Sequence, residues 1–138
     1  METTVVPSRQ ETEVLFSLPF QPDGAAFLLG PGASVVMPPQ PAAIPPAPAI
    51  ALGMLVAGYS AVNFFSLSDQ AMTLTIEEAN DAEGPFAVVA TFTSVAAGAL
   101  QAIRQRFTPV GSFMRVTLTN TGGAETVLSF KGVGLPMT

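Results

Sequence analysis

Four carboxylates, Glu77, Glu78, Asp81 and Glu83, lie close together in the sequence and are the groups best suited to chemistry. Paired carboxylates act as general acid and base in glycoside hydrolysis, and carboxylate oxygens bind Ca²⁺. Their spacing fits no EF-hand loop, and acidic residues beside asparagine and glycine more often form a solvated hairpin. The sequence therefore favours a solvated acidic turn and predicts no metal site and no cofactor.

The residue types needed for acyl-transfer catalysis are missing. The chain has no histidine and no cysteine, which excludes Ser-His and Cys-His pairs. Its only lysine, Lys131, belongs to no Ser-x-x-Lys motif. The segment Gly30-Pro31-Gly32 predicts a turn and not a phosphate-binding loop, because proline removes an amide donor and no Gly-Lys-Ser/Thr follows. We therefore predict that the protein is not an enzyme.

The charge and composition limit the classes of partner. Five basic and ten acidic residues give a net charge of −5, which removes the phosphate-neutralising term that dominates nucleic-acid binding. We therefore expect no nucleic-acid partner. Charged residues make up 11% of the chain, against roughly 25% in an average soluble protein. A chain with so few charged residues for its surface is expected to have part of that surface covered by a partner.

Three arginines, Arg104, Arg106 and Arg115, lie in strand-like segments at positions that are expected to point outward. They are candidates for charge contacts with an acidic patch on a neighbouring copy. The alternative is a solvated face that discourages aggregation between sheet edges. In the segment Ser68-Asp69-Gln70 we expect an Asx turn, in which Asp69 bonds its own backbone.

The sequence contains no convincing membrane or secretory segment. The start of the chain lacks a basic region followed by an apolar run, so it predicts no signal peptide. The segment Ala47–Leu67 has the length of a membrane span, but proline, glycine and polar residues interrupt it and no Lys or Arg flanks it. We expect buried β-strands there, with a turn near Gly58, and no membrane partner.

The distribution of proline divides the chain. Nine of the thirteen prolines lie between Pro19 and Pro48. Since proline lacks an amide donor and fixes φ, Val35–Pro48 is expected to run as extended polyproline II with its backbone unpaired. We therefore predict an extended proline-rich N-terminal arm over residues 1–48 and a separate domain over residues 49–138.

The second part of the chain is β throughout. Short runs rich in Val, Phe, Thr, Leu and Ile are separated by turn residues. Met114, Val116 and Leu118 alternate with polar residues, as in a strand with one buried face. The segment Phe86–Phe92 is almost continuously apolar and predicts a strand that is covered on both faces or lies at the centre of a sandwich. The pattern predicts an antiparallel β-sandwich or jelly roll. The expected strands are 61–68, 72–78, 86–92, 99–107, 112–120 and 125–133.

Several motifs resemble a β-sandwich module of tailed-phage virion proteins. They are GYSAVNFFSLSDQAMTLTIEEANDAEGPF, SVAAGALQAI, FMRVTLTNTGG and VLSFKGV, which together cover about residues 50–135. Met72 departs from the module, which usually has glycine after Gln-Ala. The resemblance implies a capsid decoration (cement) protein on the capsid exterior of the virion, with the major capsid protein and copies of itself, as a trimer, for partners. The alternative is a tail-fibre, baseplate or head-fibre module that binds a host surface glycan.

The predicted arm offers a way of gripping a shell. A segment that is already extended loses less entropy on docking than a flexible one. The alternative is that the segment folds back on its own sandwich as an extra edge strand, and both arrangements are compatible. The expected partner contacts of the arm are Leu15, Phe16, Phe20, Phe27, Leu28, Leu29, Val36, Met37, Pro38 and Pro39.

Overall fold

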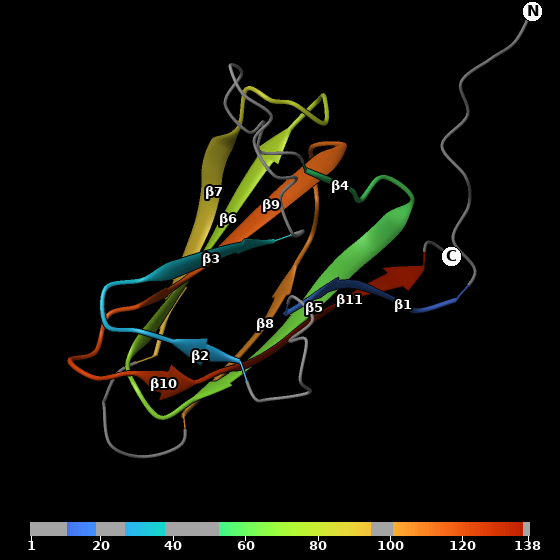
Figure 1. The fold of residues 1–138 in the computed structure, drawn as a ribbon. Coiled ribbons are helices and arrows are strands. Elements are labelled where there is room, and N and C mark those ends of the chain that lie inside the picture. Colours follow the sequence, from blue (N-terminus) through green and yellow to red (C-terminus); the bar gives the residue numbers. More distant parts are fainter. Residues whose placement is uncertain (1–10, 19–26, 38–52, 95–100, 137–138) are drawn as a thin grey trace, which may run out of the picture.

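The computed structural model describes residues 11–18, 27–37, 53–94 and 101–136, without the side chains of residues 101 and 102. These residues form two antiparallel sheets that face each other as a sandwich (Figure 1). The prediction of an all-β antiparallel sandwich is confirmed. No helix among the described residues is long and apolar enough to cross a membrane.

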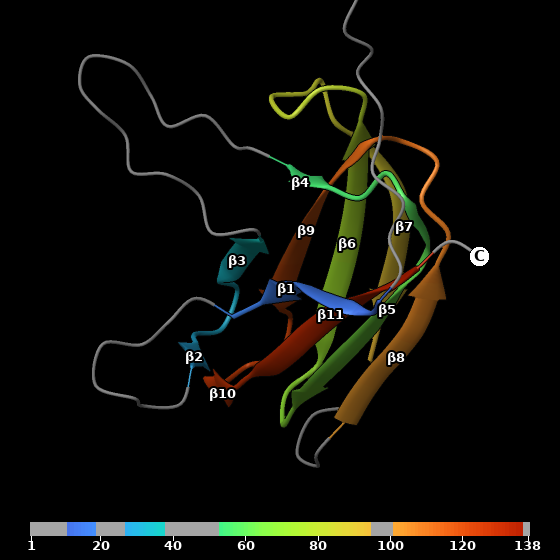
Figure 2. The ribbon, with the colours of Figure 1, turned by 90° about the vertical axis from the view of Figure 1, so that its right-hand side faces the viewer.

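Sheet 1 has the strand order β1-β11-β5-β8 and is seen face-on in Figure 2. Its strands are β1 (Glu13–Ser17), β11 (Ser129–Pro136), β5 (Tyr59–Ser68) and β8 (Gln101–Phe107).

Sheet 2 has the order β3-β9-β6-β7, and β4 also pairs with β9. Its strands are β3 (Ser34–Met37), β9 (Phe113–Asn120), β6 (Met72–Ala79), β7 (Ala87–Thr93) and β4 (Met54–Leu55). A third, two-stranded sheet of β10 (Thr126–Val127) and β2 (Leu28–Leu29) lies at one end of the sandwich.

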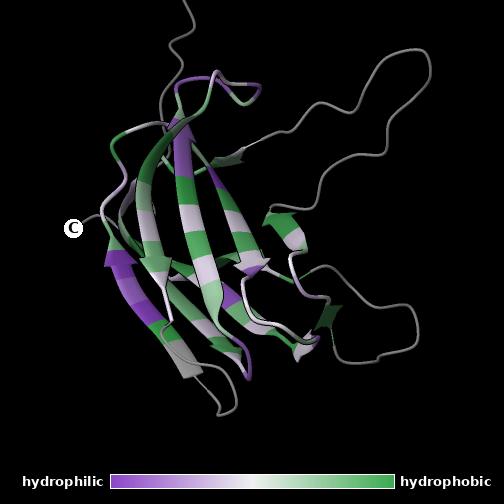
Figure 3. Ribbon diagram, turned by 90° about the vertical axis from the view of Figure 1, so that its left-hand side faces the viewer, coloured by the Kyte–Doolittle hydropathy of each residue, from purple (hydrophilic) through white to green (hydrophobic). Residues whose placement is uncertain are grey.

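The alternation predicted for the central strands of sheet 2 is confirmed. Leu74 and Ile76 on β6 and Val116 and Leu118 on β9 are fully buried, and the residues between them face outward (Figure 3). Each such side chain stabilises the fold by about 1.5–3 kcal/mol when it is fully buried. Met72, which departs from the module's glycine, is also fully buried and extends this core.

The prediction for Phe86–Phe92 was wrong. Among the described strands, β7 pairs only with β6 and forms the edge of sheet 2, and most of its side chains are exposed. Val88 is 61% exposed and Val89 is 45% exposed. The β6–β7 register shifts between Ile76, which pairs with Ala90, and Glu77, which pairs with Val88, so Val89 is an extra residue on β7 that breaks the regular alternation. A run of apolar residues therefore marks an edge strand here, and not a strand covered on both faces.

The described parts of residues 1–48 belong to the sandwich, so the division at residue 48 needs correction. β1 pairs with β11 at one edge of sheet 1, and β3 pairs with β9 at the edge of sheet 2. Because Val35–Met37 contain no proline, their amides can donate hydrogen bonds to β9, and they are not unpaired polyproline II. Pro38–Pro48 lie outside the described residues. This arrangement agrees with the alternative in which the segment folds back on its own domain.

Close packing over β11 requires glycine. A Cβ atom at Gly134 would lie 2.6 Å from the Tyr59 ring and 2.9 Å from Leu15, and one at Gly132 would lie 2.9 Å from the Phe16 ring. These distances are below van der Waals contact. Side chains from β1 and β5 therefore occupy the space above β11 that any larger residue would need.

We predict that Gly134→Ala lowers the free energy of unfolding by about 1–3 kcal/mol, because overpacking forces the ring or the backbone to shift. Urea denaturation measures this change. Gly123→Ala is the control, since a Cβ there meets nothing within 4 Å. Equal stability of the two variants would show that the Tyr59 ring moves freely.

Candidate partner-binding face

The outer surface of sheet 1 gathers cations around an exposed aromatic residue. Phe65 on β5 is 42% exposed and lies opposite Arg104 on β8 and Lys131 on β11. Residues directly opposite in an antiparallel pair point to the same side of a sheet, so the three side chains share the outer surface. Leu67, two residues along β5, is 41% exposed on the same side. With Arg106, which lies opposite Asn63, these residues form what we call the basic face.

The cations of the basic face make no ion pair with the described carboxylates. Strands β5, β8 and β11 contain no Asp or Glu, and none of Arg104, Arg106 and Lys131 makes an ion pair within the described part of the chain. Arg104 Cζ lies 5.9 Å from the centroid of the Phe65 ring, and Arg106 Nε donates a hydrogen bond of 2.8 Å to Asn63 Oδ1. The guanidinium groups are thus positioned by neutral partners, and their charge remains available.

Two shallow hollows flank Phe65. One, of about 310 Å³, is lined by Phe65, Leu67, Arg104, Lys131 and their neighbours Ser66 and Ser129. The other, of about 220 Å³, lies on the side of Arg106 and Asn63. The surface of the basic face is therefore uneven, and Phe65 and Leu67 form an apolar ridge between the positive charges.

Arg115 does not belong to this face, although the sequence grouped it with Arg104 and Arg106. It lies on β9 in sheet 2, where its Nη2 atom donates to Glu77 Oε2 and its Cζ atom lies 4.2 Å from the Phe86 ring centroid. Its charge is satisfied within the chain. Lys131 takes its place on the basic face, and the alternation of buried Phe130 with exposed Lys131 was the signal that could have identified it.

The outer side of sheet 2 is neutral over most of its area. Threonines on three adjacent strands are aligned in two rows, and cross-strand threonine pairs of this kind stabilise a sheet. The first row continues onto β3 through a hydrogen bond of 2.7 Å between Ser34 Oγ and Thr119 Oγ1. The rows are Thr119-Thr73-Thr93 and Thr117-Thr75-Thr91. The two outer faces of the sandwich therefore differ in chemistry.

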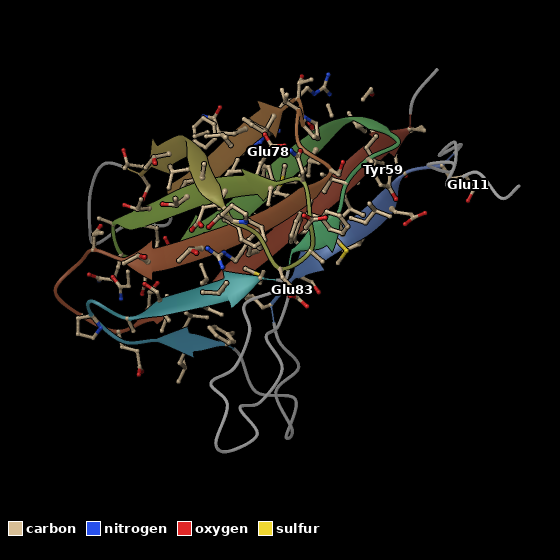
Figure 4. The ribbon with its side chains drawn as sticks, turned by 90° about the horizontal axis from the view of Figure 1, so that it is seen from above. Glu11, Tyr59, Glu78 and Glu83 are labelled. Atoms are coloured by element: carbon tan, nitrogen blue, oxygen red, sulfur yellow. The ribbon has the colours of Figure 1, made fainter. Side chains whose placement is uncertain are left out.

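The predicted acidic turn divides into a structural and a solvated part. Glu78 is only 7% exposed, and its Oε2 atom accepts hydrogen bonds from the amides of Val110 (3.0 Å) and Gly111 (2.8 Å). It therefore holds the β8–β9 connection, which corrects the expectation of a solvated side chain (Figure 4). Asp81 and Glu83 are exposed on the β6–β7 connection, as expected. No group of His, Cys, Asp and Glu among the described residues is arranged to hold a metal ion.

Asp69 also has a different partner from the one expected. Its carboxylate accepts a hydrogen bond from the Thr126 hydroxyl, and its own amide donates to that hydroxyl at 3.1 Å. Thr126 is fully buried. The reciprocal pair joins the β5–β6 turn to β10, so Asp69 anchors a distant strand and does not close a local Asx turn.

The residues expected to contact a partner through the arm fall into four groups. Leu15, Phe16, Leu29 and Met37 are buried in the core, so these four are corrected from partner contacts to core residues. Leu28 is 53% exposed. Phe27 and Val36 are half-buried, and Phe20, Pro38 and Pro39 lie outside the described residues. A register shift in β1 between Val14 and Phe16 accompanies two successive inward side chains, a pattern that simple alternation does not predict.

Comparison with known proteins supports the fold. No protein-family model matches the chain, and no curated protein matches it. Among solved structures, it is similar to the crystal structure of PBSX exported protein XepA, with a TM-score of 0.61 and 18% sequence identity. The match covers 97% of this chain but 41% of that one, so the chain spans about two fifths of the length of XepA. The likeness shows a shared fold over nearly the whole chain.

We predict that Glu78→Ala lowers the free energy of unfolding by about 2 kcal/mol, because hydrogen bonds to a charged group contribute about 1.5–3 kcal/mol. Glu83→Ala on the β6–β7 connection is the matched control, since its side chain is exposed. Thermal and urea unfolding measure both variants. If Glu78→Ala and Glu83→Ala unfold alike, the two hydrogen bonds from Val110 and Gly111 contribute nothing measurable.

Proposed function

We propose that this chain is a non-enzymatic phage virion protein that decorates the outside of the capsid and stabilises the lattice of the major capsid protein. The observation that carries the proposal is the likeness of its fold, over nearly the whole chain, to an exported protein of the phage PBSX. The motifs that resemble the virion module point in the same direction. Since one fold supports many functions, the proposed role must also be supported by the chemistry of the surface.

The surface supports binding to protein better than catalysis. The basic face joins exposed apolar side chains, Phe65 and Leu67, to cations that have no ion-pair partner among the described residues. Central apolar anchors with a charged surround are the features from which protein interfaces draw affinity and orientation. The chain has no histidine or cysteine to supply a nucleophile or a base near neutral pH.

The mechanism we propose is multivalent. A decoration protein binds a shell built of many identical subunits, so weak contacts made by each copy sum to a large avidity when copies also contact one another. A trimer around a three-fold axis is the arrangement that the resemblance implies. The proline-rich segment 38–48, which lies between β3 and β4 in the sequence, remains our candidate for direct contact with the major capsid protein.

The structure determines which variant tests this role. A chain that begins at Ala49 would lack β1, β2 and β3, together with the buried Phe16 and Met37, and would lose part of its core. Replacing residues 38–48 with a Gly/Ser segment of equal length keeps every described strand. It removes only the stiffness and the apolar groups of the proline-rich segment.

We predict that the full chain co-sediments with capsids stripped of this protein and that the Gly/Ser variant binds at least about tenfold more weakly, a loss of roughly 1.4 kcal/mol. Unchanged thermal unfolding would confirm that the variant keeps its sandwich. Equal binding by both proteins would move the capsid contact onto the sandwich. Absence of binding by the full chain would contradict decoration and favour the glycan-binding fibre module.

A further inference from the structure

We propose that the basic face of one copy binds the β6–β7 connection of a second copy through Asp81 and Glu83. We call the connection, residues 80–86, the acidic hairpin. The inference rests on the proposed function, in which copies lie side by side on a shell, and it names the surfaces that meet. It assigns a role to two cations, Arg104 and Lys131, and two carboxylates that make no ion pair within the described part of the chain.

The acidic hairpin is held in one shape before any contact forms. The amide of Gly84 donates to the carbonyl of Asp81 at 3.0 Å, and the amide of Gly53 donates to the carbonyl of Ala82 at 2.8 Å. These bonds fix the backbone on both sides of Glu83. A loop that is already ordered loses little entropy when it docks.

Neither carboxylate is used within its own copy. Asp81 and Glu83 are exposed, and neither makes an ion pair or a hydrogen bond through its side chain within the described part of the chain. The same holds for the charges of Arg104 and Lys131. The acidic hairpin lies at the end of the sandwich opposite β2 and β10, beyond the strand ends (Figures 1 and 2), where an approaching molecule can reach it.

The spacing of the charges is compatible with a direct contact. Arg104 and Lys131 lie on either side of Phe65, two strand spacings apart, which is about 9.5 Å between their Cα atoms. Asp81 and Glu83 are two residues apart, so their Cα atoms are separated by at most about 7 Å. The long side chains of arginine and lysine span the difference, and each cation can meet one carboxylate.

Apolar contacts accompany the charges. Pro85 is exposed and Ala82 half-exposed on the acidic hairpin, and the opposing ridge consists of Phe65 and Leu67. Exposed ion pairs alone contribute little, so the apolar ridge supplies affinity while the charges select the partner and its orientation. Arg–carboxylate pairs are often bidentate, which favours one orientation of the hairpin over others.

The contact joins two different surfaces, so it is heterologous. Every copy offers one basic face and one acidic hairpin, and each can therefore bind two neighbours. Such contacts form a closed ring when the rotation between copies closes, and a filament when it does not. The competing explanation is that the cations only keep sheet 1 from aggregating, in which case their removal increases association.

The test compares two variants of the full chain that lower the net charge equally. Arg104→Gln/Lys131→Gln neutralises the basic face, and Thr91→Glu/Thr93→Glu adds two carboxylates to the exposed edge of sheet 2. Sedimentation velocity over a range of concentrations measures association at about 0.02 M and about 0.5 M salt, where charges are weakly and strongly screened. Circular dichroism and thermal unfolding show whether each variant is folded.

We expect the unmodified protein to associate at low salt and to dissociate at high salt. The glutamine variant should bind at least about tenfold more weakly at low salt, and the threonine-face variant should bind within about twofold of the unmodified protein, since only the former removes the direct charge contacts. A protein that is monomeric under all conditions, or association that the glutamine variant retains, would overturn the proposal. Capsid binding can persist in either case, so this result is distinct from that of the capsid experiment.

A charge exchange identifies the acidic partner. Arg104→Glu/Lys131→Glu and Asp81→Lys/Glu83→Lys should each fail to associate alone, and a mixture of the two should form hetero-oligomers because the reversed hairpin meets the reversed face. Rescue in the mixture supports the acidic hairpin as the occupant. Loss of association in each variant without rescue in the mixture would show that the basic face does not receive this hairpin.

Discussion

The packing of Phe16 against sheet 1 is the contact on which the rest of the architecture depends. Its ring lies over Gly132 of β11, and its centroid is 6.0 Å from that of Phe64 on β5, which stacks in turn on Phe130 at 6.1 Å. This aromatic row joins β1 to the centre of the sheet. Because burial of a phenylalanine contributes several kcal/mol, an N-terminal segment that supplies one cannot be detached from the domain without loss of stability.

Strands β1 and β3 are the edge strands of the two sheets at one side of the sandwich. Strands β7 and β8 are the edge strands at the other side. The two outer faces differ in chemistry: sheet 2 presents the hydroxyl and methyl groups of threonines, and sheet 1 presents cations around Phe65. A surface that is neutral on one face and charged on the other binds in one orientation. The N-terminal strands thus influence function by deciding which surfaces remain free.

Local pattern was sufficient for the central strands that have one buried face, and insufficient to show which strands pair or which lie at an edge. Alternation identified β6 and β9 together with their buried residues, because period two needs no knowledge of the partner strand. It could not show that the apolar run containing Phe16 pairs with β11, since that contact joins opposite ends of the chain. Alternation also predicted that Arg115 points outward. It could not show that Arg115 lies on sheet 2 beside Glu77, because that position depends on which strands pair.

The low charge content of the chain limits which side chains can take part in recognition between copies. In a chain with only 11% charged residues, Glu77 and Arg115 neutralise each other and Glu78 holds a loop, so few charges remain for recognition. Among those that remain, Arg104, Arg106 and Lys131 lie on sheet 1 and Asp81 and Glu83 lie apart from them on the β6–β7 connection, whereas Glu13 on β1 and Glu125 before β10 are exposed elsewhere. Segregation on one rigid body favours contact between copies over contact within a copy. On a shell that holds neighbouring copies close together, the same contacts are occupied more fully than in solution, because the effective concentration of each partner is high.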